Sequence, residues 1–422
     1  MIETAYKRTY SEDWDFRYSD TKEFTHSYHN YPAMMIPQIA RKLIEDFSPK
    51  GEVNLVFDPY MGSGTTLVES KIKGINSIGT DINPLARFMA KVKTTNYDVH
   101  QVDKLTETLK NKTKLYKPNY GHKLPNVTNV DFWYSKDNVS ELCFLTNEIN
   151  SLNSEIKDFF LIALSECVRE VSYTRNGEFK RYRMAEDKIT SYKPDTFELF
   201  FEKVKRNRKG LIELNSVNSQ AEVIISDFNS VYNIPDNILS NNSVDLVVTS
   251  PPYGDSRTTV AYGQFSRWAN EWFNFENAKN LDNLLMGGTK IKKLSLKTES
   301  ISNELNQIKS LDEKRYQEVL YFLDDYYNSI NNVSNKIRIG GRVCYVVGNR
   351  NVKGIQIPLD YFTVESFERN GFKHIDTFVR KIPNKRMPSK TSPTNKKGLN
   401  VTTMMNEFII ILEKESQHLT RG

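Results

Sequence analysis

Short apolar runs alternate with amphipathic stretches in the first hundred residues of the chain. VNLVF at 53–57 precedes a glycine-containing loop and the helix-compatible segment TTLVESKIKG, and INSIGT at 75–80 precedes a second such segment, LARFMAKVKT. Strands that alternate with helices in this way form a mainly parallel sheet with helices on both faces. The pattern therefore predicts an α/β fold of the doubly wound, Rossmann-like type.

The alternation stops at about residue 104 and resumes after about residue 215. The intervening text is polar and mostly helical in pattern, with EIKDFFLIALSECVREV as its clearest amphipathic segment, so we expect a helical insertion at 104–215. A second excursion is expected at 254–310. The remaining strands are predicted at AEVIIS (221–226), VDLVVTS (244–250), RVCYVVG (342–348), KHIDTFVRKI (373–382) and NEFIIILEK (406–414).

Composition narrows the class of protein. The 422 residues include three widely spaced cysteines, Cys143, Cys167 and Cys344, with no CxxC pair, which argues against a disulfide framework or a zinc site. No apolar run approaches the roughly 18 residues of a membrane span. We therefore expect a soluble, cytoplasmic protein without a membrane partner.

Positive charge is concentrated in three runs. The net charge of +6 permits a polyanionic partner without requiring one. These runs are KVKRNRK at 203–209, KIKK at 290–293 and the loop-like stretch at 381–398. Each run is a candidate for contacts with a phosphate backbone, although a solvated surface would have the same composition.

The loop after the first predicted strand reads DPYMGSGTT at 58–66. Its glycines allow the backbone to approach a ligand closely, and the helix that follows offers its positive N-terminus. A phosphate-binding P-loop is excluded, because the required Lys-Ser/Thr ending is replaced by Thr65-Thr66. A simple tight turn would also account for the glycines.

Two aspartates are expected at neighbouring strand ends. Asp81 follows the second strand about 20 residues after the glycines, where an acidic residue of a nucleotide-binding fold accepts hydrogen bonds from ribose hydroxyls. Asp227 follows the third strand, where a carboxylate can reach an adenine amino group. Either residue alone would also serve as an ordinary helix N-cap. Together with the glycine loop, they predict a pocket for an adenosine.

The fourth predicted strand ends in TSPPY at 249–253. Two adjacent prolines remove two backbone donors and fix φ, so the segment is rigid and presents carbonyl oxygens without competing N–H groups. An aromatic ring follows at once. This combination suits a planar ring that carries an amino group.

The arrangement resembles the S-adenosylmethionine-dependent amino-methyltransferases of DNA. Residues 60–64, YMGSG, fit the (F/Y)xGxG motif of this family, and TSPPY fits its (D/N/S)PP(Y/F/W) motif in the form common among cytosine-N4 enzymes. The segment HNYPAMMIP at 29–37 is similar to the family's approach to the cofactor helix, which flanks the methionine moiety. The resemblance covers roughly 25–95 and 220–415.

The resemblance implies three parts of one Rossmann-like methyltransferase. Residues 25–103 would be the first, cofactor-binding part of the catalytic domain, 104–215 a helical insertion with a possible role in target recognition, and 216–415 the second part with the inserted 254–310 region. S-adenosylmethionine would be the methyl donor, with no metal required. The implied cofactor-binding residues are Asn30, Pro32, Asp58, Tyr60, Gly62, Ser63, Gly64, Thr65, Asp81, Ile82, Asn83, Asp227 and Phe228.

The TSPPY segment would carry the chemistry. An exocyclic amine conjugated to a ring is a poor nucleophile, so the site must hold the NH₂ with acceptors that favour a tetrahedral nitrogen. Ser250 Oγ and the Pro251 carbonyl are the expected acceptors, Pro252 keeps them rigid, and Tyr253 would stack on a base extruded from the duplex. The expected activity is site-specific cytosine-N4 methylation of double-stranded DNA, with a cognate restriction endonuclease as a candidate partner.

The order of the motifs leaves the target base open. Many cytosine-N4 enzymes have the SPPY motif before the glycine loop, whereas here the glycine loop comes first, which is more usual among adenine-N6 enzymes. An RNA amino-methyltransferase and an inactive DNA-binding subunit are further alternatives. Target recognition is expected from the insertion, from the basic stretch after 381, or from the 254–310 region with Arg257, Arg267, Trp268 and Lys290.

Overall fold

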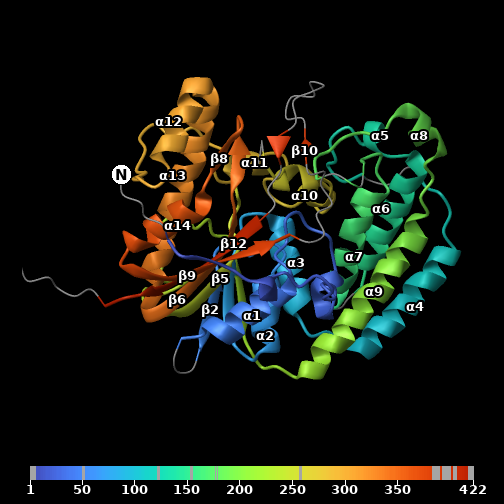
Figure 1. Ribbon diagram of the computed structural model, residues 1–422. Helices are drawn as coiled ribbons and strands as arrows, with labels where there is room; N and C mark the ends of the chain where they lie inside the picture. The colour runs from blue at the N-terminus through green and yellow to red at the C-terminus, as the bar shows by residue number, and fades with distance from the viewer. Residues whose placement is uncertain are drawn as a thin grey trace, which may run out of the picture.

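An eight-stranded sheet forms the centre of the molecule, with strand order β1-β9-β12-β6-β5-β2-β3-β4 (Figure 1). The computed structural model describes residues 6–49, 53–120, 124–152, 155–175, 177, 179–255, 259–382, 390–391, 401–402 and 406–416. The strands of this sheet are β1 (Arg8–Tyr10), β2 (Leu55–Asp58), β3 (Asn76–Thr80), β4 (Val223–Ser226), β5 (Val244–Thr249), β6 (Ile337–Gly348), β9 (Phe372–Lys381) and β12 (Asn406–Lys414).

Most of the sheet is parallel, as the sequence pattern predicts. β6, β5, β2, β3 and β4 run parallel to one another, whereas β12 lies antiparallel between β6 and β9. All seven predicted strands are present. The edge strand β1, which pairs in parallel with β9, was not predicted, because three residues are too few to show a period.

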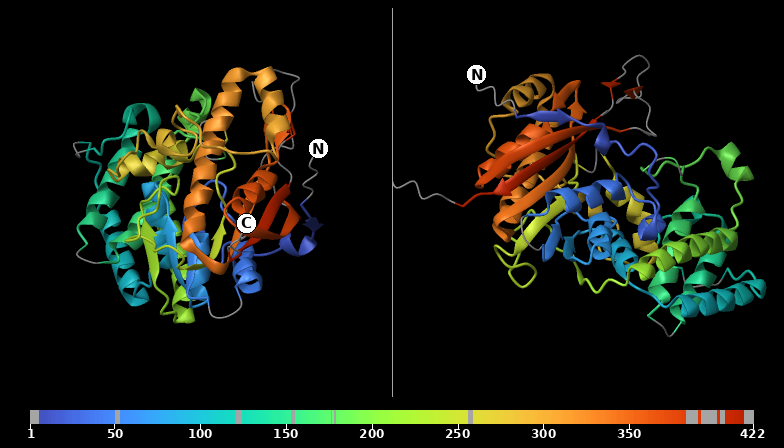
Figure 2. Two further views of the ribbon diagram at one scale, coloured as in Figure 1. Left: turned by 90° about the vertical axis from the view of Figure 1, so that its left-hand side faces the viewer. Right: turned by 60° about the horizontal axis from the view of Figure 1, so that its bottom comes forward.

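Side chains of the central strands alternate between two buried faces, so the strands read as continuous apolar runs. On one face, Val56, Leu246 and Val346 pack against α1 (Pro37–Phe47). On the other, Phe57 and Val247 face α13 (Glu313–Lys336) and α14 (Leu359–Glu368). The sheet lies between these two groups of helices, which confirms the doubly wound architecture (Figure 2).

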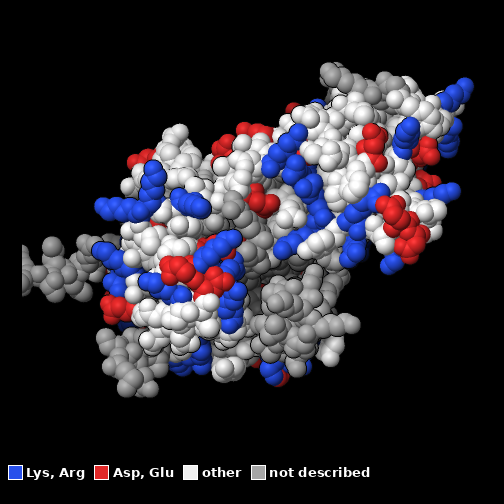
Figure 3. Space-filling model, turned by 90° about the horizontal axis from the view of Figure 1, so that it is seen from above, with Lys and Arg blue, Asp and Glu red and all other residues white. Residues whose placement is uncertain are grey.

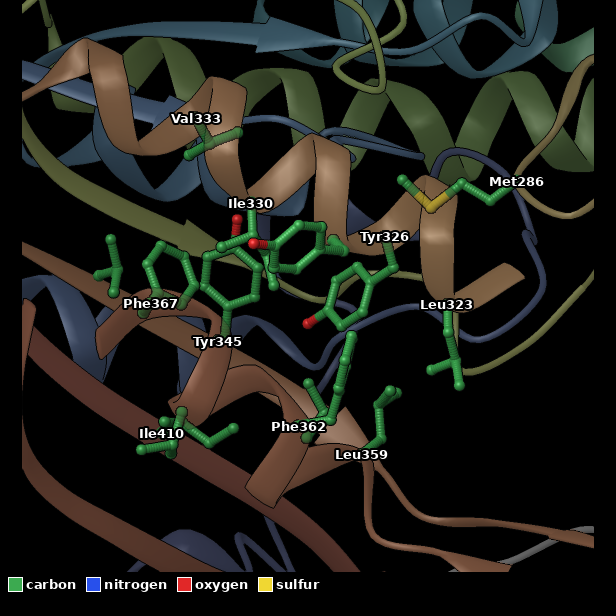
Figure 4. Close-up of a cluster of buried hydrophobic side chains, with 14 of the residues drawn as sticks. Met286, Leu323, Tyr326, Ile330, Val333, Tyr345, Leu359, Phe362, Phe367 and Ile410 are labelled. Atoms are coloured by element: carbon green, nitrogen blue, oxygen red, sulfur yellow. The ribbon is translucent and has the colours of Figure 1, made fainter. Parts of the chain in front are cut away.

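The core on the α13 side is rich in aromatic rings (Figure 4). Tyr345 of β6 meets Phe367 of α14 edge to face, with ring centroids 5.0 Å apart. The hydroxyl of Tyr326 pairs with that of Thr363 at 2.9 Å, so this buried polar atom is satisfied. The cluster fixes α13 and α14 on the sheet beside the strand ends that carry the predicted site.

Helices of the predicted insertion pack to one side of the sheet (right in Figure 1). Phe159 and Leu164 of this segment share one hydrophobic cluster with Tyr28 and Met89, so the insertion continues the core of the α/β fold. Its boundaries as a domain stay a prediction. The helices are α4 (Val99–Lys114), α5 (Val130–Trp133), α6 (Lys136–Asn150), α7 (Lys157–Glu170), α8 (Glu186–Ser191) and α9 (Thr196–Val217).

The second excursion lies above the carboxyl ends of the strands (Figure 1). Its helices are α10 (Tyr262–Trp272), α11 (Leu281–Leu284) and α12 (Ser302–Leu311). Trp268, expected as a recognition residue, is fully buried in the core that α10 shares with the insertion. Arg257 and most of the basic stretch at 381–398 lie outside the described residues. None of the helices in the described ranges is long and apolar enough to cross a membrane.

The remaining elements are short. Helices α2 (Thr65–Ile72) and α3 (Pro84–Thr94) follow β2 and β3. Two hairpins, β7 (Arg350–Val352) with β8 (Ile355–Ile357) and β10 (Lys390–Thr391) with β11 (Val401–Thr402), stand apart from the main sheet, and the 3-10 helices are η1 (Glu12–Trp14) and η2 (Phe24–Ser27).

Candidate active site

Asp58, the last residue of β2, joins the glycine loop to the end of β5. Its Oδ1 accepts hydrogen bonds from the backbone N–H of Tyr60 at 3.1 Å and from the hydroxyl of Thr249 at 2.5 Å. Burial raises the pKa of this carboxyl from 3.8 to about 6, although the hydroxyl bond opposes the shift. The two sequence motifs are therefore held together by one side chain.

The two glycines of the loop adopt left-handed backbone conformations. Gly62 has φ +47°, and its N–H donates to Oδ2 of Asp81 at 3.1 Å. Gly64 has φ +81° and lies at the N-cap of α2, where a Cβ atom would meet the Cβ of Ala90 at 2.8 Å. Residues with a side chain are disfavoured at both positions. The loop can thus pass close to α3 while the N-terminus of α2 borders the pocket.

Asp81 follows β3 and accepts hydrogen bonds from two backbone N–H groups, those of Gly62 and of Asn83, the latter at 2.7 Å. Burial raises its pKa from 3.8 to about 6, against the opposing effect of these bonds. Asn83 is fully buried, and its side-chain amide donates to the hydroxyls of Tyr31 and Ser266. This asparagine caps α3 and holds α10 against the cofactor side of the sheet.

The glycine loop and TSPPY line a common pocket. Of the predicted residues, those that border it are Pro32, Asp58, Tyr60, Gly62, Ser63, Thr65, Asp81, Ser250 and Pro252. The buried Pro251 carries the chain between Ser250 and Pro252. The pocket therefore combines two carboxylates, a helix N-terminus and a serine hydroxyl at the carboxyl edge of one parallel sheet.

Other predicted residues lie outside this pocket. Asn30 is exposed, and its amide donates to Glu166 at 2.8 Å. Asp227 is exposed at the end of β4 and borders a separate hollow with Arg87, while Phe228 packs on the α13-side core. Gly64, Ile82, Asn83 and Tyr253 are also absent from the lining. The cofactor contacts of Asn30, Gly64, Ile82, Asn83, Asp227 and Phe228 stay predictions, as does the stacking of Tyr253 on the target base.

Sequence reasoning missed several residues that border the pocket. Tyr31 and Met34 lie within the segment 29–37, of which the family resemblance implies only Asn30 and Pro32 as cofactor-binding residues. Met61 lies inside the glycine motif. Tyr262 of α10 and Leu285 reach the pocket from the second excursion, and no local pattern distinguishes them from ordinary core residues.

The basic run at 203–209 is largely engaged in ion pairs within the protein. Lys203 is buried and pairs with Glu170 at 2.6 Å, and Arg206 pairs with Glu166 at 2.7 Å. Arg208 forms a bidentate pair with Asp103. Three of its basic side chains thus hold α9 to neighbouring helices, which weakens the expectation that this run contacts a phosphate backbone.

The fold and pocket define the class of protein. A doubly wound sheet brings a glycine loop, a strand-end carboxylate, and Ser250 and Pro252 of the TSPPY segment to one pocket, as expected for a Rossmann-like methyltransferase. Within the described ranges, no group of three or more His, Cys, Asp or Glu side chains is placed to hold a metal ion.

Comparisons with known proteins agree with this class. The DNA methylase family model matches residues 3–91. The chain is 40% identical to the type II methyltransferase M.MvaI of Kocuria varians, over 94% of this chain and 93% of that protein. It is 23% identical to the type II methyltransferase M.BsoBI of Geobacillus stearothermophilus, over 84% and 80% of the two chains.

Among solved structures, a DNA modification methylase from Thermus thermophilus in complex with S-adenosyl-L-methionine matches 43% of this chain and 52% of that one, with 18% identity and a TM-score of 0.21. With this TM-score, the two structures do not superpose closely enough for their residues to be compared one by one. The match to M.MvaI over nearly the whole length is decisive: the chain belongs to the N4/N6 family of DNA methylases. It is a type II DNA methyltransferase that uses S-adenosylmethionine.

Proposed function

We propose that the chain transfers a methyl group from S-adenosylmethionine to the exocyclic N4 amine of cytosine within a specific sequence of double-stranded DNA. The observation that carries this proposal is the presence of Ser250 in one pocket with Asp58 and Asp81. A neutral hydroxyl stands where adenine enzymes more often have an aspartate or asparagine. We further propose that the protein protects DNA against a cognate restriction endonuclease.

The residues of the pocket fit the cofactor. The carboxylates of Asp58 and Asp81 offer acceptors, and Gly62, with φ +47°, borders the pocket with backbone alone. S-adenosylmethionine supplies an electrophilic methyl group on a sulfonium. Asp81 is proposed to bind the ribose hydroxyls, and the loop at 60–65 to bind the remainder.

The TSPPY residues are proposed to hold the amine. Ser250 Oγ and the Pro251 carbonyl accept hydrogen bonds from the NH₂ group, which reduces the delocalisation of its lone pair into the ring. Pro252 restricts the backbone, so that the acceptors are positioned before the base arrives. Because duplex DNA hides this amine from a pocket, the base must be extruded first.

The face above the pocket is proposed to bind DNA. Figure 3 shows this face, on which Lys and Arg side chains form a band across the middle. The segment YTRNGEFKRYR at 173–183 has four basic residues and one acidic residue. Its ends pair through an antiparallel bridge between Thr174 and Arg183, and Arg181 lies over the ring of Trp268 at 4.7 Å. We call 173–183 the basic hairpin.

The basic hairpin is connected to the pocket through α10. Phe179 packs edge to face on Phe265, which in turn packs on Tyr31 of the pocket lining. Phe179 and Tyr182 are each more than two-fifths exposed, so aromatic rings stand beside cationic groups on the open surface. Such a combination suits a phosphate backbone and unstacked bases.

The product of the reaction tests the assignment of the base. DNA methylated by the purified protein would be digested to nucleosides and analysed by mass spectrometry, with S250A as the inactive control. We expect N4-methylcytosine in the wild-type sample and no methylated nucleoside with S250A. N6-methyladenine without N4-methylcytosine would refute the cytosine assignment.

Adenine-N6 methylation is the second candidate, and the order of the motifs favours it. The glycine loop precedes TSPPY in this chain, which is the more usual arrangement among adenine enzymes. Adenine presents a comparable amine beside a ring nitrogen, so the acceptors of Ser250 and Pro251 would serve it equally. The same digestion distinguishes the two candidates.

A further inference from the structure

A chain of polar side chains leads from the last strand of the sheet to TSPPY. The hydroxyl of Tyr253 donates to Oε1 of Glu407 at 3.2 Å, and the hydroxyl oxygens of Tyr253 and Ser250 are 3.0 Å apart. Arg380 donates from Nη1 to the other carboxylate oxygen of Glu407 at 2.9 Å. Glu407 and Arg380 face each other across β12 and β9.

The chemistry of these groups fixes the direction in which each hydrogen bond along Glu407, Tyr253 and Ser250 is donated. An ionised glutamate has acceptors only, so the proton of the Tyr253 hydroxyl must point to Glu407. Burial, and next the charge of Glu407, raise the pKa of this phenol well above its usual range, so it keeps the proton that it donates. The phenol oxygen is then left to accept the proton of Ser250. Because Ser250 borders the pocket and its proton is donated to Tyr253, the lone pairs of Ser250 Oγ are left to accept a hydrogen bond on the pocket side.

We propose that Glu407 is a positioning residue that fixes the direction of the hydrogen bonds along Glu407, Tyr253 and Ser250. Ser250 then donates its proton to Tyr253, and Ser250 Oγ accepts a hydrogen bond from the amine of the target base. This inference rests on the proposed function of Ser250 as an amine acceptor. A serine proton directed at the amine would instead engage the lone pair that attacks the methyl group. Without Glu407, the two hydroxyls could donate in either direction.

An ordinary ion pair between strands would not need contact with the catalytic segment. The same strand provides such a pair, because Glu413 of β12 binds Arg342 of β6 at 2.8 Å. Its glutamate side chain is 36% exposed, compared with 18% for Glu407. Glu413 is therefore a matched control for Glu407, with the same residue type, partner type and strand.

The test substitutes E407Q and measures kcat, KM for DNA and the Kd for S-adenosylmethionine. Since Arg380 only donates, the amide oxygen of the variant side chain would face Arg380 and its NH₂ group would face Tyr253. Tyr253 would then accept from the amide and donate to Ser250, the reverse of the wild-type direction. We expect kcat to fall by about 10- to 100-fold, less than the loss of a full transition-state donor, while KM and Kd stay within about twofold. E413Q should keep the wild-type kcat.

A double-mutant cycle separates an effect on hydrogen-bond direction through Tyr253 from a structural effect of the E407Q substitution. Y253F keeps the ring but removes the hydroxyl that connects Glu407 to Ser250, so it should also lower kcat by about tenfold or more. In the Y253F background, E407Q should change kcat by less than about twofold. An equal effect of E407Q in both backgrounds would show that Glu407 acts by another route and would overturn the proposal.

Further outcomes keep the proposal distinct from the proposed function. Full kcat in Y253F or in a folded E407Q protein overturns the positioning role, even if the wild type makes N4-methylcytosine. If the wild type makes N6-methyladenine, the base assignment fails, and the cycle still decides the role of Glu407. If E407Q does not fold, E407D and Y253F decide: the proposal requires E407D to retain more activity than Y253F.

Discussion

At the scale of single residues, the pocket contains carboxylates that are costly to bury without a ligand. Asp81 has a pKa raised to about 6 by burial, yet its proposed partners, ribose hydroxyls, donate hydrogen bonds to the ionised form. Ligand binding should therefore lower the pKa of Asp81. The affinity of the protein for its cofactor then depends on pH.

The expected pH dependence has a definite sign. Above about pH 6, Asp81 is already ionised in the free protein and the affinity for S-adenosylmethionine is complete. As the pH falls below 6, the free protein binds a proton that the complex must release, so the affinity should fall by up to about tenfold per pH unit. Calorimetric titrations at pH 8, 6 and 5 measure this change.

D81N provides the control for this prediction. This variant should bind the cofactor weakly at pH 8 and lose less affinity on acidification than the wild type. The pH dependence that remains would come from Asp58, whose pKa is also raised to about 6. A wild-type affinity that is constant from pH 8 to pH 5 would show that Asp81 does not bind the ribose.

Residue types and motifs in the sequence predicted Asp58, Gly62 and Asp81, which border the pocket, whereas Asp227, predicted in the same way, borders a separate hollow. They did not identify Glu407, which is 154 positions from Tyr253 in sequence. A glutamate near the start of an apolar strand reads as a solvated strand end. Its contact with Tyr253 depends on the position of β12 in the sheet, which strand patterns do not encode.

At the scale of elements, α2 and α3 approach each other at Gly64. Substitution by alanine there would place a Cβ atom 2.8 Å from that of Ala90, at a residue with φ +81°. G64A should therefore lower the free energy of unfolding by about 2–5 kcal/mol, the sum of left-handed strain and overpacking. Urea denaturation of the cofactor-free protein measures the change.

Gly74 is a matched control for Gly64. It has φ +73° but no atom within 4 Å of the position of a Cβ. G74A should lose only the strain of about 1–2 kcal/mol, and cofactor affinity should be unchanged. Equal losses in G64A and G74A would mean that α3 moves aside at no cost.

Elements were predicted best where the pattern is local. The seven predicted strands stand out as short, largely apolar runs and helices such as α7 and α13 as amphipathic stretches, and all are present. The basic run at 203–209 was interpreted less well, because its carboxylate partners, Glu166, Glu170 and Asp103, come from other helices. The roles of α10 and of Leu285 in the pocket likewise depend on the folding of a long excursion over the sheet.

At the scale of the whole molecule, DNA affinity should depend on salt through the face that carries the basic hairpin. R175Q/K180Q removes two positive charges from this hairpin. If both side chains contact phosphates, the slope of log K against log salt should become less steep by roughly 1.8. Fluorescence anisotropy with a labelled duplex, at several salt concentrations, measures the slope.

K205Q/K209Q removes the same charge from the exposed side of α9, within the run at 203–209. This control should leave the slope unchanged. The reverse result would be a less steep slope for K205Q/K209Q and an unchanged slope for R175Q/K180Q. It would place the DNA on α9 and would reject the basic hairpin as the contact.

The position of β12 has a consequence for biosynthesis. This strand, at 406–414, separates β9 from β6, and the N-terminal strand β1 pairs with β9. During translation, neither β1 nor β9 can join the sheet until these late residues leave the ribosome. Glu407 arrives with them. A nascent chain can therefore complete its glycine loop well before β12, which brings Glu407 to Tyr253 and connects β9 to β6, has been synthesised.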